Sequence, residues 1–275
     1  MDRKIFNDPE SDLAFKKNGF VLLPFLGDVE VKKCMEIFET MPPAMDAKFY
    51  TSHLNKDENY RRSIHEKLGQ ILSAGAERLL HQYTTAYNYF MVKNSGAGSE
   101  VRLHQDWTLV DEDHFTSLIF WCPLTDTNEN NGIFKYVKNS HLFIRNIRGT
   151  GIEPGYSSIM SEVENKFLTS VSVSAGQAIA FDHRLVHASS ENLSGKTRVV
   201  AGTVLRPKES QFIHYVANPG SDQYNLYKGD QDFLLKFSFG DDPEACLAKT
   251  DIKRNMNPQI SFAEFSELFE KFSSR

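Results

Sequence analysis

The chain has 275 residues, with 31 lysines and arginines against 36 aspartates and glutamates, so its formal net charge is −5. This charge gives no electrostatic reason to expect a nucleic acid or a membrane surface as a partner, and no apolar run is long enough to span a bilayer. Three widely spaced cysteines without a Cys-x-x-Cys pair predict reduced thiols in a cytoplasmic protein rather than a disulfide framework.

The N-terminal part, about residues 12–83, is predicted to be mainly helical. A short helical turn at 12–17 precedes a strand at 19–26, and a helix follows over about 29–41. Between about 57 and 83 apolar residues recur at helical spacing, which is typical of a helix with one buried face. We interpret the part up to about residue 43 as scaffold.

From residue 84 the pattern changes to short runs rich in aromatic and β-branched residues, separated by Gly-rich turns. These runs predict strands at 85–93, 116–124, 133–137, 169–173, 177–181 and 198–206. Many short strands with helices at one end predict a mainly β fold of the jelly-roll type, with its core at about 84–206.

The C-terminal extension, residues 207–275, loses this period, and 220–229 is interpreted as a loop. At 261–272 a capping box of Ser261 and Glu264 and apolar residues at helical intervals predict an amphipathic helix. We expect it to pack on the barrel, and a homodimer contact is the alternative.

The first segment whose side chains could carry out chemistry is His104-Gln105-Asp106-Trp107. If it is extended, the imidazole and the carboxylate two residues apart point to the same face. A second histidine, from the distant stretch 178–192, would complete two imidazoles and one carboxylate. Non-haem Fe(II) oxygenases use this ligand set, which leaves coordination positions open.

The stretch 178–192 offers two histidines, His183 and His187. Their spacing suits a helical zinc site, but no glutamate follows His183 and the stretch is interpreted as a strand, where four residues span about 13 Å. His183 is therefore expected in a loop or at the rim, and Asp182 is a weak alternative carboxylate.

Several motifs occur in a characteristic order: Gly19-Phe20-Val21 with Pro24-Phe25-Leu26, His104-Gln105-Asp106, Asn130-Asn131-Gly132 with Ser140-His141, and Phe181 with His187-x-Ser189 and Arg198. In this order the chain resembles the phytanoyl-CoA dioxygenase family over about residues 13–206. The resemblance implies a single Fe(II)- and 2-oxoglutarate-dependent oxygenase domain over 1–275, with a double-stranded β-helix core. One departure is Lys138-Asn139, where the family often has Pro-Gly before Ser-His, and His141 is interpreted as structural.

The resemblance also implies residue roles. His104, Asp106 and His187 would hold Fe(II), and 2-oxoglutarate and O2 would be cosubstrates at the open positions. The far carboxylate of 2-oxoglutarate would meet Arg198, eleven residues after His187, with further contacts from Ser189 and Trp121.

The implied reaction is hydroxylation, or another oxidation, of an unactivated C–H of a small-molecule metabolite, with release of succinate and CO2. Because Asp106 stands where halogenating relatives carry Gly or Ala, we expect oxygenation rather than halogenation. Candidate substrate residues are Gln105, Trp107, Lys93, Phe134 and Lys135. A non-catalytic metal-binding β-barrel module and a zinc hydrolase that uses the same residues are the alternatives.

Overall fold

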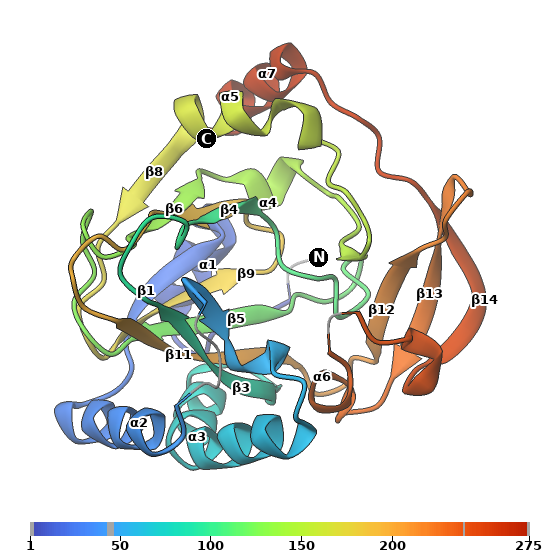
Figure 1. Ribbon diagram of the computed structural model, residues 1–275. Coiled ribbons are helices and arrows are strands. Elements are labelled where there is room, and N and C mark those ends of the chain that lie inside the picture. The colour runs from blue at the N-terminus through green and yellow to red at the C-terminus, as the bar shows by residue number, and fades with distance from the viewer. Residues whose placement is uncertain (1–2, 43–46, 239, 274–275) are drawn as a thin grey trace.

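The computed structural model describes residues 3–42, 47–238 and 240–273 (Figure 1). Helices begin where side chains cap free backbone N–H groups: Asp8 accepts from Ser11 at the start of the first, and Asp57 from Asn59 at the start of the third. The longer helices are α1 (Pro9–Asn18), α2 (Asp28–Thr40), α3 (Glu58–Leu79), α5 (Met160–Phe167) and α7 (Phe262–Ser273). Shorter helical segments are η1 (Ser52–Leu54), α4 (Ser140–Phe143), η2 (Ser157–Ile159), α6 (Phe233–Lys236) and η3 (Pro243–Ala245).

The larger sheet has the strand order β1-β9-β5-β11-β3-β2. Its strands are β1 (Phe20–Pro24), β2 (Phe49–Thr51), β3 (Tyr83–Lys93), β5 (Leu118–Pro123), β9 (Gln177–Asp182) and β11 (Arg198–Pro207). Helices α2 and α3 lie side by side against it (Figure 1). The apolar face of α3 explains this packing, since Ile64, Leu68 and Leu72 are fully buried with Phe90 and Val92 of β3.

The second sheet has the order β4-β10-β6-β8. Its strands are β4 (Val101–His104), β6 (Phe134–Val137), β8 (Leu168–Val171) and β10 (His187–Ser189). One buried core joins residues of both sheets, among them Trp121, Ile179 and Phe181 from the larger sheet and Phe134 from the smaller. The predicted mainly β, jelly-roll core with flanking helices is therefore confirmed, and it corresponds to a double-stranded β-helix.

A third sheet, β14-β13-β12-β7, is a correction to the prediction for the C-terminal extension. Its strands are β7 (Gly149–Thr150), β12 (Phe212–Ala217), β13 (Gln223–Gly229) and β14 (Ala248–Asn255), so the loop predicted at 220–229 is wrong over most of its length. The strand forms because Tyr224 and Leu226 are buried with Ile213 and Tyr215 of β12 in a small core of their own. This strand is stabilised by pairing with strands distant in the sequence, so the local sequence alone does not predict it.

Helix α7 packs on the second sheet's side of the molecule, next to α4 and α5 (Figure 1). Phe265 is fully buried, with its ring 5.6 Å from that of Phe143 and 5.5 Å from that of Phe167. This is the expected packing, and the homodimer contact stays a prediction. No helix among the described residues combines the length and the apolarity needed to cross a membrane.

Candidate active site

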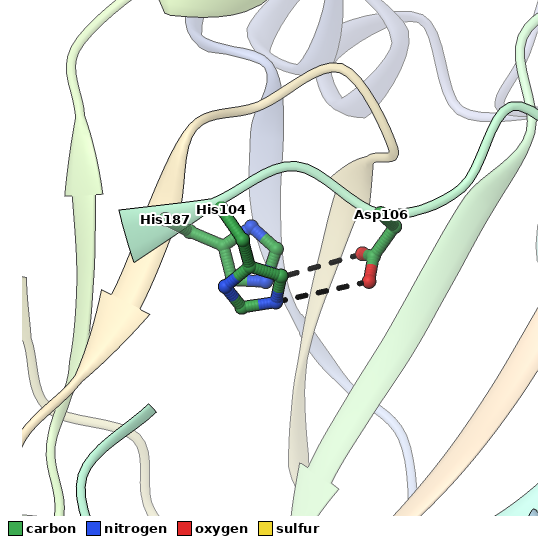
Figure 2. Close-up of side chains that lie close together, drawn as sticks. All are labelled: His104, Asp106 and His187. Atoms are coloured by element: carbon green, nitrogen blue, oxygen red, sulfur yellow. Dashed lines mark ion pairs between the residues drawn. The ribbon is translucent and has the colours of Figure 1, made fainter. Parts of the chain in front are cut away.

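Three side chains from two segments meet at the end of the second sheet. β4 and β10 are antiparallel, and their register places His187 opposite His104. Asp106 lies two residues past β4, in a loop rather than in a strand. Its carboxylate oxygens are 4.0 Å from His104 Nε2 and 3.9 Å from His187 Nε2, and Figure 2 shows the three groups pointing toward one another. The three ligand atoms lie within 4.8 Å of one another, which is close enough to share one metal ion.

Both imidazoles are held in the orientation that a metal ligand needs. His104 Nδ1 lies 2.8 Å from the carbonyl oxygen of Arg102, and His187 Nδ1 lies 2.9 Å from that of Leu185. With Nδ1 turned to a backbone carbonyl, each ring directs its Nε2 toward Asp106. Burial and the nearby His104 lower the pKa of His187 to about 4, so this imidazole is neutral at physiological pH.

The His187 ring is fixed further by aromatic neighbours. It stacks on Phe134 at 5.4 Å between centroids and lies 4.8 Å from Phe181. Phe134, predicted as a substrate residue, therefore supports a metal-ligand candidate and also lines the adjoining cavity.

Asp106 supplies the test of whether a cation fits. Its Oδ2 is buried and has no hydrogen-bond partner among the described residues, and a buried carboxylate oxygen without a donor is costly unless a cation approaches it. Burial alone would raise the pKa of Asp106, but the neighbouring imidazoles, His187 first, outweigh it and leave the pKa below its usual value. A divalent cation between the three ligands would satisfy Oδ2.

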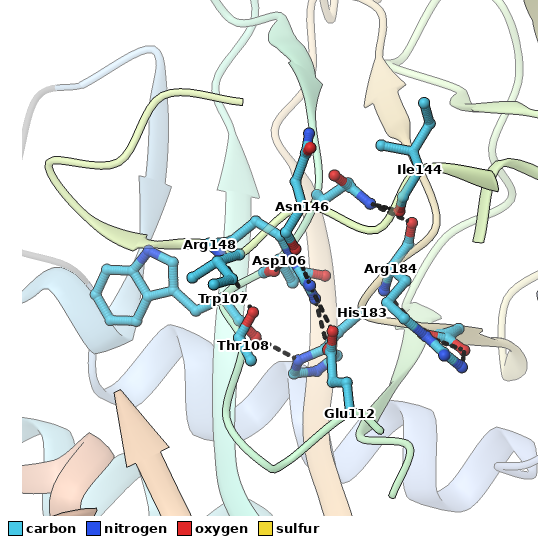
Figure 3. Close-up of polar contacts among 12 residues, drawn as sticks. Asp106, Trp107, Thr108, Glu112, Ile144, Asn146, Arg148, His183 and Arg184 are labelled. Carbon is cyan, nitrogen blue, oxygen red and sulfur yellow. Dashed lines mark hydrogen bonds and ion pairs between the residues drawn. The ribbon is translucent and has the colours of Figure 1, made fainter. Parts of the chain in front are cut away.

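A hydrogen-bond network holds the backbone of Asp106 (Figure 3). Its N–H donates to the carbonyl of His183, and its carbonyl accepts from Arg148 Nε at 2.8 Å. The buried Arg148 also donates to both carboxylate oxygens of Glu112, at 2.6 and 2.7 Å. This pair was not predictable from the sequence, because no spacing links residue 148 to residue 112 before the fold is known.

Arg198, at the start of β11, is a buried guanidinium that lacks an ion pair among the described residues. It is 2% exposed, donates one hydrogen bond to the carbonyl of Gly132, and lies 5.1 Å from the centre of the Trp121 ring. Burial lowers the pKa of Arg198 to about 9, which reflects a cation without compensation. A planar carboxylate would supply the missing counter-charge in bidentate form.

A cavity of about 340 Å³ joins the three ligand candidates to Arg198. The predicted residues on its wall are His104, Gln105, Asp106, Trp107, Trp121, Phe134, His187, Ser189 and Arg198. We call this cavity the chamber. Gln105 lines it, but its Nε2 is used by the carbonyls of Ile144 and Arg184.

Lys93 and Lys135 are the two predicted substrate residues that the structure does not place on the chamber wall. Lys93 is fully buried, and its ammonium donates to the carbonyls of Ser189 and Ser190. Lys135 follows Phe134 in β6, so strand alternation turns it to the opposite face of the sheet.

The stretch before His187 is a turn rather than the predicted strand. His183 lies in this turn, as the loop alternative expected, and not at a rim. It is 2% exposed and lines the chamber, with Nδ1 3.0 Å from the carbonyl of Trp107. Asp182 forms a buried ion pair with Arg184 at 2.6 Å, which uses its carboxylate away from the candidate metal ligands. His141 is buried with Nε2 3.1 Å from the carbonyl of Lys16, in agreement with a structural role.

Other chamber residues gave no usable signal in the sequence. His53, Tyr87, Tyr89 and Met91 come from the N-terminal region and β3, while Leu234 and Phe237 come from the extension. The alternation of Tyr87, Tyr89 and Met91 along β3 marks one face of a strand, but only the closed barrel shows that this face is the inner one.

Fold and site together define a class of protein: a double-stranded β-helix with a two-histidine, one-carboxylate metal-binding arrangement beside a buried arginine. The model of the family described as phytanoyl-CoA dioxygenase matches residues 39–200, more than half of the chain. The chain therefore belongs to the phytanoyl-CoA dioxygenase family.

Individual relatives agree with this assignment. A protein of Arabidopsis thaliana named phytanoyl-CoA dioxygenase is 35% identical over 113 residues, which are 40% of this chain and 39% of the plant protein. The match thus spans about two fifths of that relative's length.

Among solved structures, the α-ketoglutarate-dependent carbocyclase SnoK from nogalamycin biosynthesis is 19% identical, with a TM-score of 0.54 over 74% of this chain and 86% of SnoK. The epimerase SnoN, solved with Fe3+, α-ketoglutarate and nogalamycin RO, is 16% identical, with a TM-score of 0.54 over 92% of this chain and 95% of SnoN. HygX from Streptomyces hygroscopicus, solved with nickel and 2-oxoglutarate, is 16% identical, with a TM-score of 0.51 over 74% of this chain and 88% of HygX. Likeness at these identities shows the shared fold.

Proposed function

We propose that the chain is a single-domain Fe(II)- and 2-oxoglutarate-dependent oxygenase that hydroxylates an unactivated C–H bond of a small molecule. The observation that carries this proposal is the meeting of two unsatisfied groups in one chamber. Among the residues that the structure describes, Asp106 Oδ2 is a buried anion without a donor, and Arg198 is a buried cation without a carboxylate. A metal ion and a dicarboxylate that chelates it would satisfy both.

Different residues would bind the metal ion and the cosubstrate. His104, Asp106 and His187 would hold Fe(II) on one side and leave its other side to the chamber. Arg198 would bind the far carboxylate of 2-oxoglutarate, with Ser189 as a hydroxyl donor and Trp121 packed against the guanidinium. When bound, iron and 2-oxoglutarate supply oxidative chemistry in which substrate, 2-oxoglutarate and O2 give the hydroxylated product, succinate and CO2.

The proposal specifies hydroxylation as the type of oxidation. Asp106 supports it over halogenation, because the carboxylate fills the coordination position that a halide would need. The carbocyclase and epimerase among similar structures have the same fold, so product analysis has to separate hydroxylation from other C–H oxidations.

The first experiment measures succinate formed from 2-oxoglutarate by the protein with Fe(II) and ascorbate, in the presence of a panel of small molecules. We expect succinate from the wild type and a fall to background in Asp106→Ala, because this variant loses a metal ligand. Asp113→Ala, which removes an exposed carboxylate, serves as the matched control. Metal analysis after anaerobic reconstitution distinguishes iron from zinc. Succinate at background in the wild type, with metal still bound, would favour the non-catalytic module.

A further inference from the structure

The chamber has two ends, set by the register of β3 against β11. Lys93 pairs with Arg198, and Tyr89 pairs with Gly202 four residues along. At about 3.3 Å per residue these two levels are about 13 Å apart. The Arg198 end is the proposed cosubstrate site. The Tyr89 end is therefore left for the molecule that is oxidised.

The Tyr89 end is walled largely by aromatic rings from segments far apart in the sequence. His53 lies edge-on to Tyr89 with centroids 5.4 Å apart, and Tyr89 stacks with Tyr87 at 5.7 Å. Trp107, next to Asp106 in the chain and labelled in Figure 3, lies 6.1 Å from Phe237 of the C-terminal extension. Rings in a cavity favour the faces and edges of other rings.

Charged side chains are scarce on this wall. Among the described lining residues the only carboxylate is Asp106 and the only arginine or lysine is Arg198, and the proposed function uses both. Burial lowers the pKa of His53 to about 4, so its imidazole is neutral at physiological pH. A charged substrate group would lose its hydration here without gaining a counter-charge, which disfavours its binding.

Two polar groups stand among the rings. His53 Nδ1 lies 2.7 Å from Thr51 Oγ1, so Nε2 is its remaining hydrogen-bonding atom. The ring of Tyr89 reaches across Gly202, where a Cβ would approach the ring to 2.7 Å. A neutral imidazole nitrogen and a phenol both bond to a hydroxyl, and either group as a donor bonds to a carbonyl oxygen.

We propose that the chamber takes an uncharged, ring-containing substrate with a hydroxyl or carbonyl oxygen, and that His53 and Tyr89 recognise this oxygen. The proposal rests on the proposed function, because it assigns the Arg198 end to 2-oxoglutarate. A coenzyme A thioester or a free carboxylate meets no cation among the described residues at the Tyr89 end. The aromatic walls, contributed in part by Phe237, favour a ring over an extended acyl chain.

The experiment uses the full chain loaded anaerobically with Mn(II) and 2-oxoglutarate, so that binding is measured without turnover. The probes are 4-coumaryl alcohol, 4-coumarate and 4-coumaroyl-CoA, which share one ring and differ in charge, together with the larger neutral compound naringenin. Isothermal titration calorimetry gives the dissociation constants. We expect a neutral probe to bind at least about tenfold more tightly than the carboxylate or the thioester, which corresponds to about 1.4 kcal/mol.

Two variants test the residue assignment. His53→Phe keeps a ring and removes the hydrogen bond, so we expect the neutral probe to bind about tenfold more weakly while Mn(II) and 2-oxoglutarate bind as in the wild type. His114→Phe, at a histidine whose side chain is 57% exposed, is the matched control and should bind all probes as the wild type does. Tyr89→Phe should weaken binding in the same direction as His53→Phe.

The outcomes separate the two proposals. If Mn(II) and 2-oxoglutarate bind but the charged probes bind as tightly as the neutral ones, or no neutral probe binds, the substrate class is overturned and the proposed function stands. Unchanged probe affinity in both His53→Phe and Tyr89→Phe overturns the recognition role. Failure to bind Mn(II) and 2-oxoglutarate overturns the proposed function and the substrate class together.

Discussion

Arg198 and Lys93 are neighbours across two strands, and both are buried cations without an ion pair among the described residues. Gly132 lies between them: its carbonyl accepts from Arg198, and a Cβ at this position would approach the Lys93 side chain to 2.9 Å. A buried cation without a counter-charge destabilises a folded chain, so the persistence of Arg198 on the chamber wall is best explained by an anionic ligand. The two residues contribute differently, because Arg198 lines the chamber and Lys93 does not.

Replacement of Arg198 by methionine separates ligand binding from folding. We expect the KM for 2-oxoglutarate to rise about 10- to 100-fold, because charge-assisted hydrogen bonds to a carboxylate are lost. The Tm without cosubstrate should stay the same or increase, because a buried unpaired cation is removed. Arg102→Met, at an arginine whose side chain is 62% exposed, is the control. An unchanged KM would remove Arg198 from the cosubstrate site.

Lys93 predicts a pH dependence of stability. Burial, with Arg198 nearby, lowers the pKa of Lys93 from 10.5 to about 7. In the unfolded chain the Lys93 amine is protonated below about pH 10.5. The unfolding free energy therefore falls as the pH is lowered from about 10.5, and this loss is complete below about pH 7. Lys93→Met removes this pH-dependent loss of stability.

We therefore expect the unfolding free energy of Lys93→Met, relative to wild type, to increase as the pH is lowered from 10 to 7. Denaturant titrations at several pH values measure this difference. Lys135→Met, at a half-buried lysine, should give no such trend. A flat difference for Lys93→Met would show that its ammonium is paired in solution.

At the scale of elements, β11 connects the two ends of the chamber. It begins at Arg198 and passes Gly202, which pairs with Tyr89 on one side and with Trp121 of β5 on the other. A side chain at 202 would occupy the space of the Tyr89 ring, so a small residue in this strand sets the shape of the chamber.

Gly202→Ala tests this contact. The added methyl would lie 2.7 Å from Tyr89 Cζ, and we expect a loss of about 1–3 kcal/mol in the unfolding free energy, as for other overpacked cores. In a Tyr89→Ala background the same substitution should cost much less, because the ring it meets is gone. Equal costs in both backgrounds would place the strain elsewhere.

Elements with a strong local pattern were predictable. The apolar stripe of α3 and the aromatic run of β3 gave elements within a few residues of those observed. β12 to β14 were not predictable in the same way, because their stability depends on pairing with one another and with β7. For the stretch around His183 a loop was one of the two expected positions, but its burial was not predictable, because the turn is fixed by a backbone contact with Asp106.

At the scale of the whole molecule, the site combines a predictable part and an unpredictable one. Two segments about eighty residues apart provide His104 and His187, and the family motif order was enough to pair them. The wall at the Tyr89 end of the chamber includes His53, which precedes the barrel in the chain, and Phe237, which follows it. Only the assembled fold brings these two residues together. In the proposed substrate assignment this wall selects the substrate, which is why the sequence indicated the chemistry more readily than the molecule it acts on.

The same assembly predicts that ligands stabilise the entire chain. Because the candidate metal ligands join β4 to β10 and Arg198 anchors β11, Mn(II) with 2-oxoglutarate should bind the folded state and not the unfolded one. At a ligand concentration 100-fold above Kd the gain is about 2.7 kcal/mol, and each kcal/mol raises Tm by about 2–4 °C for a chain of this size. Differential scanning calorimetry with and without the ligands measures the shift.

Asp106→Ala should abolish this shift, whereas Asp113→Ala should keep it, because only Asp106 faces the two imidazoles. Mn(II) alone should give part of the effect. Arg198→Met should retain that part and lose the further increase that 2-oxoglutarate gives. A full shift in Asp106→Ala would mean that the metal binds at other residues. The two variants thus assign the metal and the dicarboxylate to separate ends of one site by their effect on the stability of the whole molecule.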